Sequence, residues 1–118
     1  MEDWIRGMNE DIIKSIDTAH KIKKHKMSLQ VCKQYLNVLQ CNPTETMAYE
    51  ANQYATEVYK DIQREELEIA VANTCYFPRN VDLVTGVKEN LKAAINMLNQ
   101  VLAKEAKEEL DNINEAMR

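Results

Sequence analysis

The sequence predicts an all-α fold, a four-helix antiparallel bundle with a long C-terminal helix. Only two glycines and two prolines occur in 118 residues, and both residue types normally mark turns and helix ends. Apolar residues recur every three or four positions over most of the chain, the spacing of amphipathic helices. With 45% hydrophobic and 29% charged residues, the composition is that of a globular domain with one core. We therefore expect residues 1–118 to form a single helical domain.

The first 41 residues are expected to form two helices. An apolar stripe predicts the first over residues 2–25, and four lysines near its end suit the helix dipole. Ser28 is the expected N-cap of the second, over 28–41, which ends before Pro43 because the residue preceding a proline disfavours α geometry. The stripe of the first helix consists of Ile5, Met8, Ile12, Ile16 and Ala19.

Thr44 is the expected N-cap of a third helix that reaches Phe77-Pro78. Its apolar stripe shifts phase after Ile62, so the helix either continues, straight or kinked, or breaks near residues 61–64. The continuous form is favoured.

Asn80 is the expected N-cap of the last and longest helix, with Asp82 just inside it. Its apolar series runs from Val84 to Met117 in nine steps over 33 residues, or 3.67 residues per step. That spacing predicts packing as a straight bundle helix rather than as a heptad coiled coil. A helix this long is expected to outrun its neighbours. Leu110, Ile113 and Met117 near its end are therefore predicted to mediate self-association.

Charge is unevenly distributed along the chain. The formal net charge is −4, but residues 41–78 alone carry two basic and seven acidic residues. This distribution disfavours direct nucleic-acid binding, which needs clustered cations. The acidic start of the chain and the lack of a long apolar run predict a cytoplasmic protein without a membrane partner. The three cysteines lie far apart and are expected to be buried thiols rather than metal ligands.

Ala19-His20-Lys21-Ile22-Lys23 resembles the A-H-x-x-K core of histidine phosphotransfer domains, which are also small four-helix bundles. The resemblance implies that His20 is phosphorylated and that Lys23 lies next to the phosphate. The family has small residues after the lysine, whereas this chain has Lys24-His25-Lys26. Phosphotransfer through His20 is therefore kept as the alternative function, and the segment is interpreted first as a basic helix end.

Two acidic motifs resemble those with which the all-α nucleotide pyrophosphohydrolases hold Mg²⁺. Glu65-Glu66-Leu67-Glu68 matches E-x-x-E, and Glu108-Glu109-Leu110-Asp111 matches E-x-x-D. They lie about 40 residues apart, farther than in that family. We interpret them as a solvated acidic face and expect neither a metal nor a cofactor.

Pro43 and Pro78 lie 35 residues apart, and each follows a helical segment. The first segment resembles the end of a tetratricopeptide repeat, whose helix pairs recur about every 34 residues. A short tetratricopeptide-like helix array is therefore the alternative fold.

These patterns favour a non-enzymatic helical module that binds a protein partner as an adaptor, a scaffold or a small inhibitor. The expected binding surface lies on the third helix, where tyrosines off the apolar stripe meet the acidic block. Tyrosine is favoured at interfaces, and the surrounding acids would steer a basic partner. The predicted contact residues are Tyr49, Glu50, Glu57, Tyr59 and Asp61.

Overall fold

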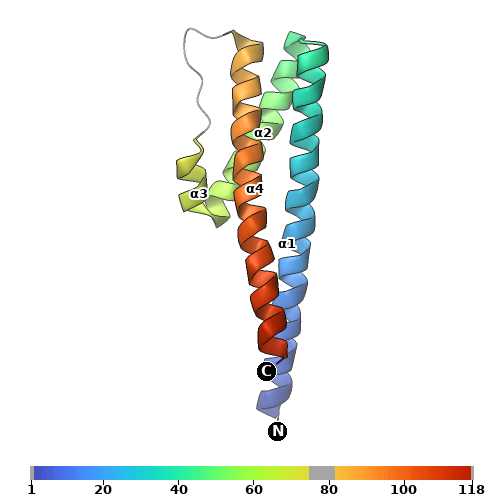
Figure 1. Cartoon of the computed structure of the whole chain (residues 1–118), viewed down its shortest axis with the longest axis vertical. Coiled ribbons are helices and arrows are strands. Elements are labelled where there is room, and N and C mark those ends of the chain that lie inside the picture. Colours follow the sequence, from blue (N-terminus) through green and yellow to red (C-terminus); the bar gives the residue numbers. More distant parts are fainter. Residues whose placement is uncertain (1, 75–81, 118) are drawn as a thin grey trace.

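The computed structural model describes residues 2–74 and 82–117, and it describes the side chains from Glu10 onward apart from Asp11. Every regular element in these residues is a helix: α1 (Glu2–Cys41), α2 (Glu45–Glu65), α3 (Leu67–Ala72) and α4 (Leu83–Ala116) (Figure 1). The predicted all-α class with four helices is confirmed. Asn80, the expected N-cap, and Phe77-Pro78, the expected end of the third helix, lie outside the described residues.

The helices form an elongated bundle of 64 × 24 × 20 Å. α1 runs its full length, and α2 starts at the far end of α1 and runs back beside it (Figure 1). α4 starts at the same end as α2 and continues past it, so the two ends of the chain lie together. α1 is therefore antiparallel to both α2 and α4.

α1 is one continuous helix of 40 residues, so the prediction of separate helices over 2–25 and 28–41 is wrong. Ser28 lies half-buried in the interior of α1 instead of capping a helix. No glycine or proline occurs between Gly7 and Pro43. The lysines at 21–26 are good helix formers, so nothing in this stretch ends the helix.

The expected continuous third helix is also wrong, because the chain leaves helical geometry at Glu66. This residue has φ −137° and ψ 70° and separates α2 from the six-residue α3. The break lies two residues beyond the alternative range, 61–64. The predicted N-cap Thr44 is confirmed: its hydroxyl accepts a hydrogen bond from the Met47 N–H at 3.3 Å.

The N-cap of α4 is Asp82, two residues after the expected cap Asn80, so the prediction that Asp82 lies just inside the helix is wrong. Its carboxylate accepts hydrogen bonds from the backbone N–H of Thr85 at 2.8 Å and from the Thr85 hydroxyl at 3.0 Å. The Thr85 N–H, one of the N-terminal backbone groups that have no partner within the helix, is thereby satisfied.

Buried positions in the two long helices recur every seven residues. In α1 the buried series is Thr18, His25, Cys32 and Leu39. In α4 there are two such series, which are Val87, Ala94 and Val101, and Leu91, Leu98 and Glu105. This spacing is shared by coiled coils and four-helix bundles, so the prediction that the last helix packs as a straight bundle helix stays a prediction. The large side chains that are fully buried each stabilise the fold by roughly 1.5–3 kcal/mol relative to exposure.

Beyond the last residue of α2, only α1 and α4 continue, side by side (Figure 1). We call this part the two-helix end: residues 10–18 of α1 and 108–117 of α4. The expectation that the last helix outruns its neighbours is wrong, because the unbroken α1 accompanies it. Such long paired helices also differ from the helix pairs of a tetratricopeptide array.

No helix in the described part of the chain combines the length and the hydrophobicity of a membrane-spanning segment.

Candidate interaction surfaces

The five residues predicted to bind a partner do not share one environment. Tyr49 is 64% exposed, and Glu50 and Glu57 are exposed. Tyr59 is half-buried and packs against the core. Asp61 is half-buried, and its carboxylate lies 3.7 Å from Lys24 Nζ and 3.9 Å from an Arg64 guanidinium nitrogen. The structure thus leaves Tyr49, Glu50 and Glu57 open to a partner.

A shallow groove between α1 and α2 gathers two of the predicted acids and two tyrosines that the sequence reasoning missed. Its lining consists of Tyr35, Glu50, Gln53, Tyr54 and Glu57. The rings of Tyr35 and Tyr54 have centroids 5.7 Å apart and planes tilted by 44°. Tyr49 immediately precedes Glu50 and therefore points about 100° away from it around α2.

Tyr54 was missed as a groove residue because it falls on the apolar spacing Met47, Ala51, Tyr54, Val58 and Ile62, which indicates the buried stripe of this helix. The core of this helix is formed instead by small side chains, Ala48, Ala51 and Ala55, followed by Val58 and Ile62. The alanines allow close helix contact, and the larger Tyr54 ring lies half-buried beside them, packed against the core like Tyr35 and Tyr59. The succession of alanines at spacings of three and four was the available signal.

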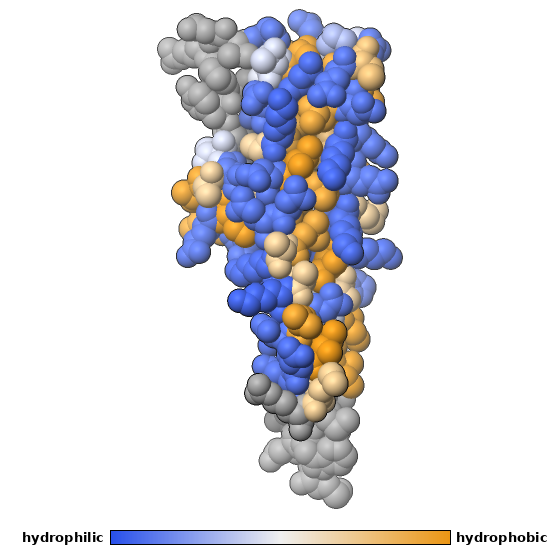
Figure 2. All heavy atoms as spheres, in the orientation of Figure 1, coloured by the Kyte–Doolittle hydropathy of each residue, from blue (hydrophilic) through white to orange (hydrophobic). Residues whose placement is uncertain are grey.

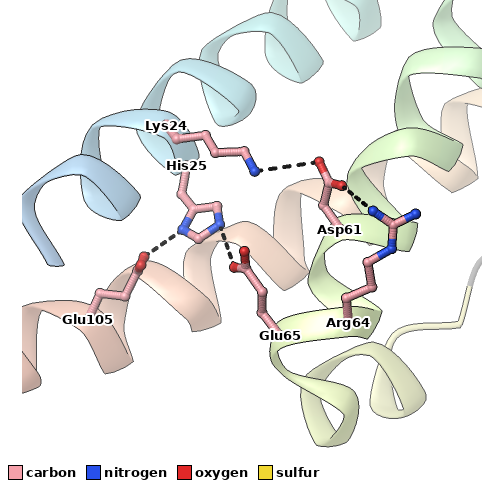
Figure 3. Close-up of polar contacts among 6 residues, drawn as sticks. All are labelled: Lys24, His25, Asp61, Arg64, Glu65 and Glu105. Atoms are coloured by element: carbon pink, nitrogen blue, oxygen red, sulfur yellow. Dashed lines mark hydrogen bonds and ion pairs between the residues drawn. The ribbon is translucent and has the colours of Figure 1, made fainter. Parts of the chain in front are cut away.

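Where the three long helices meet, His25 of α1 lies between two carboxylates (Figure 3). Its side chain is 4% exposed, and its Nδ1 lies 2.7 Å from Glu105 Oε1 on α4. Because an ionised carboxylate only accepts hydrogen bonds, Nδ1–H is the donor in this pair. Nε2 lies 3.6 Å from Glu65 Oε2 at the end of α2 and makes no hydrogen bond among the described residues. We call these three residues the histidine cluster.

Further ion pairs surround the histidine cluster and join the end of α2 to its neighbours. Lys24 and Arg64 both approach Asp61, as Figure 3 shows. On the other side, Lys104 of α4 donates a 2.6 Å hydrogen bond to Glu66, the residue at the helix break. This hydrogen bond and the charge of Glu66 raise the pKa of Lys104 above its ordinary value. The end of α2 is thus fixed by charged contacts to both long helices.

The geometry of the histidine cluster points to a structural role. His25 is almost fully buried and both of its ring nitrogens face protein carboxylates, so a substrate has no access to the imidazole. His20 has the opposite environment: it is exposed and lies in the interior of α1. The interpretation of residues 21–26 as a helix end is therefore wrong.

The acidic motifs do not form a pair of facing helices. Glu65 and Glu68 lie on opposite sides of the break at Glu66, so E-x-x-E does not lie on one helix. Glu108 and Asp111 are exposed on α4. Among the described residues, no group of three or more histidine, cysteine or acidic side chains is arranged to hold a metal ion. Of the cysteines described, Cys32 is buried in the core and Cys41 is exposed.

The two-helix end carries the largest group of exposed apolar side chains. The predicted self-association residues Leu110, Ile113 and Met117 are 57%, 50% and 81% exposed. On α1, Ile12, Ile13 and Ile16 are 53%, 57% and 50% exposed. Figure 2 shows hydrophobic surface at this end of the molecule, where α2 no longer covers the pair. We call these six residues the apolar patch.

No protein-family model, curated protein or solved structure matches this chain. The function is therefore inferred from the surfaces themselves.

Proposed function

We propose that the chain is a non-enzymatic helical protein-interaction module, serving as an adaptor, a scaffold or a small inhibitor. The partner is a protein with a basic surface, and it binds along α2. The observation that carries the proposal is the groove between α1 and α2, in which exposed Glu50 and Glu57 flank the Tyr35–Tyr54 ring pair. Aromatic anchors surrounded by charge are typical of protein interfaces.

Two further observations support a basic partner. Residues 41–78 carry an excess of five acidic residues, and Glu50 and Glu57 have no basic side chain in the groove lining to neutralise them. Uncompensated acids of this kind steer a basic partner and raise its association rate. Tyr49 extends the surface beyond the groove with a ring that is 64% exposed. Asp61 contributes less, because Lys24 and Arg64 already neutralise it.

The test is a comparative pull-down with quantitative mass spectrometry. Wild type is compared with Glu50→Lys/Glu57→Lys and with the control Glu68→Lys/Glu108→Lys, which makes the same charge change at exposed positions on α3 and α4. A partner should be lost from the first variant and retained by the control. With that partner purified, the association rate should fall as salt rises. Identical capture by all three proteins would refute the proposal.

A second candidate function is histidine phosphotransfer through His20. The observation that favours it is the continuity of α1, which puts an exposed histidine in the middle of a helix, as in the family that the A-H-x-x-K motif resembles. Incubation with a phosphodonor should then yield acid-labile phosphohistidine in wild type and none in His20→Ala. Absence of label in wild type would remove this candidate.

Self-association through Leu110, Ile113 and Met117 remains part of the proposed function. It uses a different surface from the groove and is tested separately.

A further inference from the structure

The groove between α1 and α2 continues toward the turn that joins the two helices, and there its lining is mostly apolar. This part is lined by Val31, Gln34, Tyr35, Val38 and Met47. It shares Tyr35 with the acidic part of the groove, so the two parts are continuous. Met27, which is 61% exposed, precedes Val31 by four residues and extends the same side of α1 by one turn. An apolar strip therefore runs along α1 beside the acids of α2.

The two sides of the groove differ in charge. On α2, Glu50 and Glu57 are seven residues apart and lie on one line of the helix, and neither makes an ion pair with a described residue. On α1, the only charged residue from Met27 to Gln40 is Lys33. It is two residues from both Val31 and Tyr35, so it lies about 200° around the helix from each of them. The groove is thus acidic along α2 and uncharged along α1.

The groove opens away from α4. Asn90 of α4 donates a 3.1 Å hydrogen bond to the side chain of Asn52 on α2. Asn52 is two residues from Glu50, so Glu50 lies about 200° around α2 from the side that contacts α4. The pair of α1 and α2 therefore has α4 on one face and the groove on the other, where one more helix could pack against both.

We propose that the groove binds an amphipathic helix of the partner protein, with its apolar stripe on Val31, Tyr35 and Val38 and with lysine or arginine on the flank that faces α2. The inference rests on the proposed function and specifies which element of the basic partner binds. A helix fits because both sides of the groove repeat every seven residues, Val31 with Val38 on α1 and Glu50 with Glu57 on α2. Seven residues are two turns of a bound helix lying along the groove. The bound helix should therefore carry its cations seven residues apart on one flank only.

Three fluorescein-labelled peptides of three heptads each test the proposal by fluorescence anisotropy. The first has leucines at alternating steps of three and four residues, a lysine beside the stripe in every heptad, and alanine and glutamine elsewhere. The second has the same composition in an order that forms no stripe, and the third has glutamate in place of lysine. The first should bind, and the other two should bind at least about tenfold more weakly. No binding of the first peptide, or equal binding of the second or third, would overturn the proposal.

Variants of the protein then locate the bound peptide. Val31→Asn/Val38→Asn should weaken binding of the first peptide by roughly tenfold. Val38→Asn alone, at a position that is 38% exposed, should weaken it in the same direction without disturbing the core. The matched control Leu67→Asn/Val71→Asn replaces two exposed apolar residues on α3 and should bind like wild type. Helical circular dichroism confirms the fold of each variant, and equal binding by all of them would overturn the proposal.

The remaining outcomes separate this proposal from the proposed function. If the pull-down partner requires Glu50 and Glu57 but the first peptide does not bind, the proposed function stands and the helix is wrong. If the first peptide binds in the groove but all pull-down variants capture the same proteins, the proposed function is wrong and the preference of the groove for a basic helix stands. Sedimentation equilibrium tests for a second copy as the occupant. A wild-type dimer that Val31→Asn/Val38→Asn abolishes and Leu110→Glu/Ile113→Glu retains would overturn the proposal.

Discussion

The contact between His25 and Glu105 provides the sharpest test of the packing. These side chains are 4% and 7% exposed, and their Nδ1–Oε1 distance is 2.7 Å. Replacing His25 by alanine leaves the Glu105 carboxylate buried without its donor. Breaking a buried pair by removing one partner typically costs 3–5 kcal/mol, much more than the net value of the hydrogen bond itself. We expect His25→Ala to lower the free energy of unfolding by about 3–4 kcal/mol.

The other carboxylate of the histidine cluster should contribute far less. Glu65 is 40% exposed and lies 3.6 Å from Nε2, so solvent screens this contact. Glu65→Gln is expected to cost less than about 1 kcal/mol. This variant is the control for loss of the Glu105 carboxylate, because each change removes one carboxylate next to the same imidazole.

A double-mutant cycle distinguishes the pair from simple loss of packing. His25→Leu and Glu105→Leu are made singly and together, and unfolding in urea is followed by circular dichroism. The double variant should recover about 2 kcal/mol relative to the sum of the single changes, since it leaves no buried charge. A domain of this length has a total stability of roughly 6–18 kcal/mol, so the variants remain measurable. Additive costs, or a loss below about 1 kcal/mol for His25→Ala, would refute the reasoning.

Two further predictions concern the helix cap and the tyrosines of α2. The pKa of Asp82 is lowered, chiefly because its carboxylate accepts a hydrogen bond from the Thr85 backbone N–H. The stabilisation that the ionised carboxylate provides is present above the ordinary pKa of 3.8, and it is lost as pH falls through the lower pKa of the folded state. Asp82→Asn should therefore flatten the fall in melting temperature with acidification, and unchanged pH dependence would contradict this. Tyr59→Ala should cost about 1–2 kcal/mol in urea unfolding because Tyr59 packs on the core, whereas Tyr49→Ala should stay within about 0.5 kcal/mol. Equal losses would show that Tyr49 is not a free surface residue.

Local signals in the sequence were sufficient for the class of fold and for two details. The scarcity of glycine and proline predicted long helices, and the Thr44 cap and the stop before Pro43 appear as expected. Both depend on neighbouring residues alone, since a cap hydroxyl reaches a backbone N–H three positions away and a proline restricts the residue before it.

Helix continuity could not be predicted from the same signals. Ser28 resembles an N-cap in the sequence, yet α1 continues through it, since no glycine or proline interrupts the helix there and α4 lies beside α1 on both sides of Ser28. Glu66 has no helix-breaking side chain, yet the chain turns there, where Lys104 of α4 holds its carboxylate. The contact at Glu66 comes from a residue distant in sequence.

In the candidate surfaces, too, some features could be predicted from local sequence and others depend on contacts between helices. The exposure of Tyr49 followed from its position off the apolar stripe. Leu110, Ile113 and Met117 lie on the apolar stripe of α4, and they are exposed although α1 accompanies that helix. The pairing of Tyr35 with Tyr54 and the burial of His25 against Glu105 could not be predicted from the sequence, because each joins residues on different helices.

The sequence by itself determined that this protein is helical, that α1 ends before Pro43 and that Thr44 caps α2. It could do so because hydrophobic periodicity, capping and backbone restriction act over one or two turns. Only the tertiary structure decided which face of each long helix meets the other. The contact between the long helices includes Thr18, His25 and Glu105 as well as aliphatic side chains. Polar residues that the hydrophobic pattern assigns to solvent are therefore buried against another helix. The same choice of face leaves Ile12, Ile16 and Ile113 exposed on the flank, because burial depends on which surfaces meet and not on hydrophobicity alone.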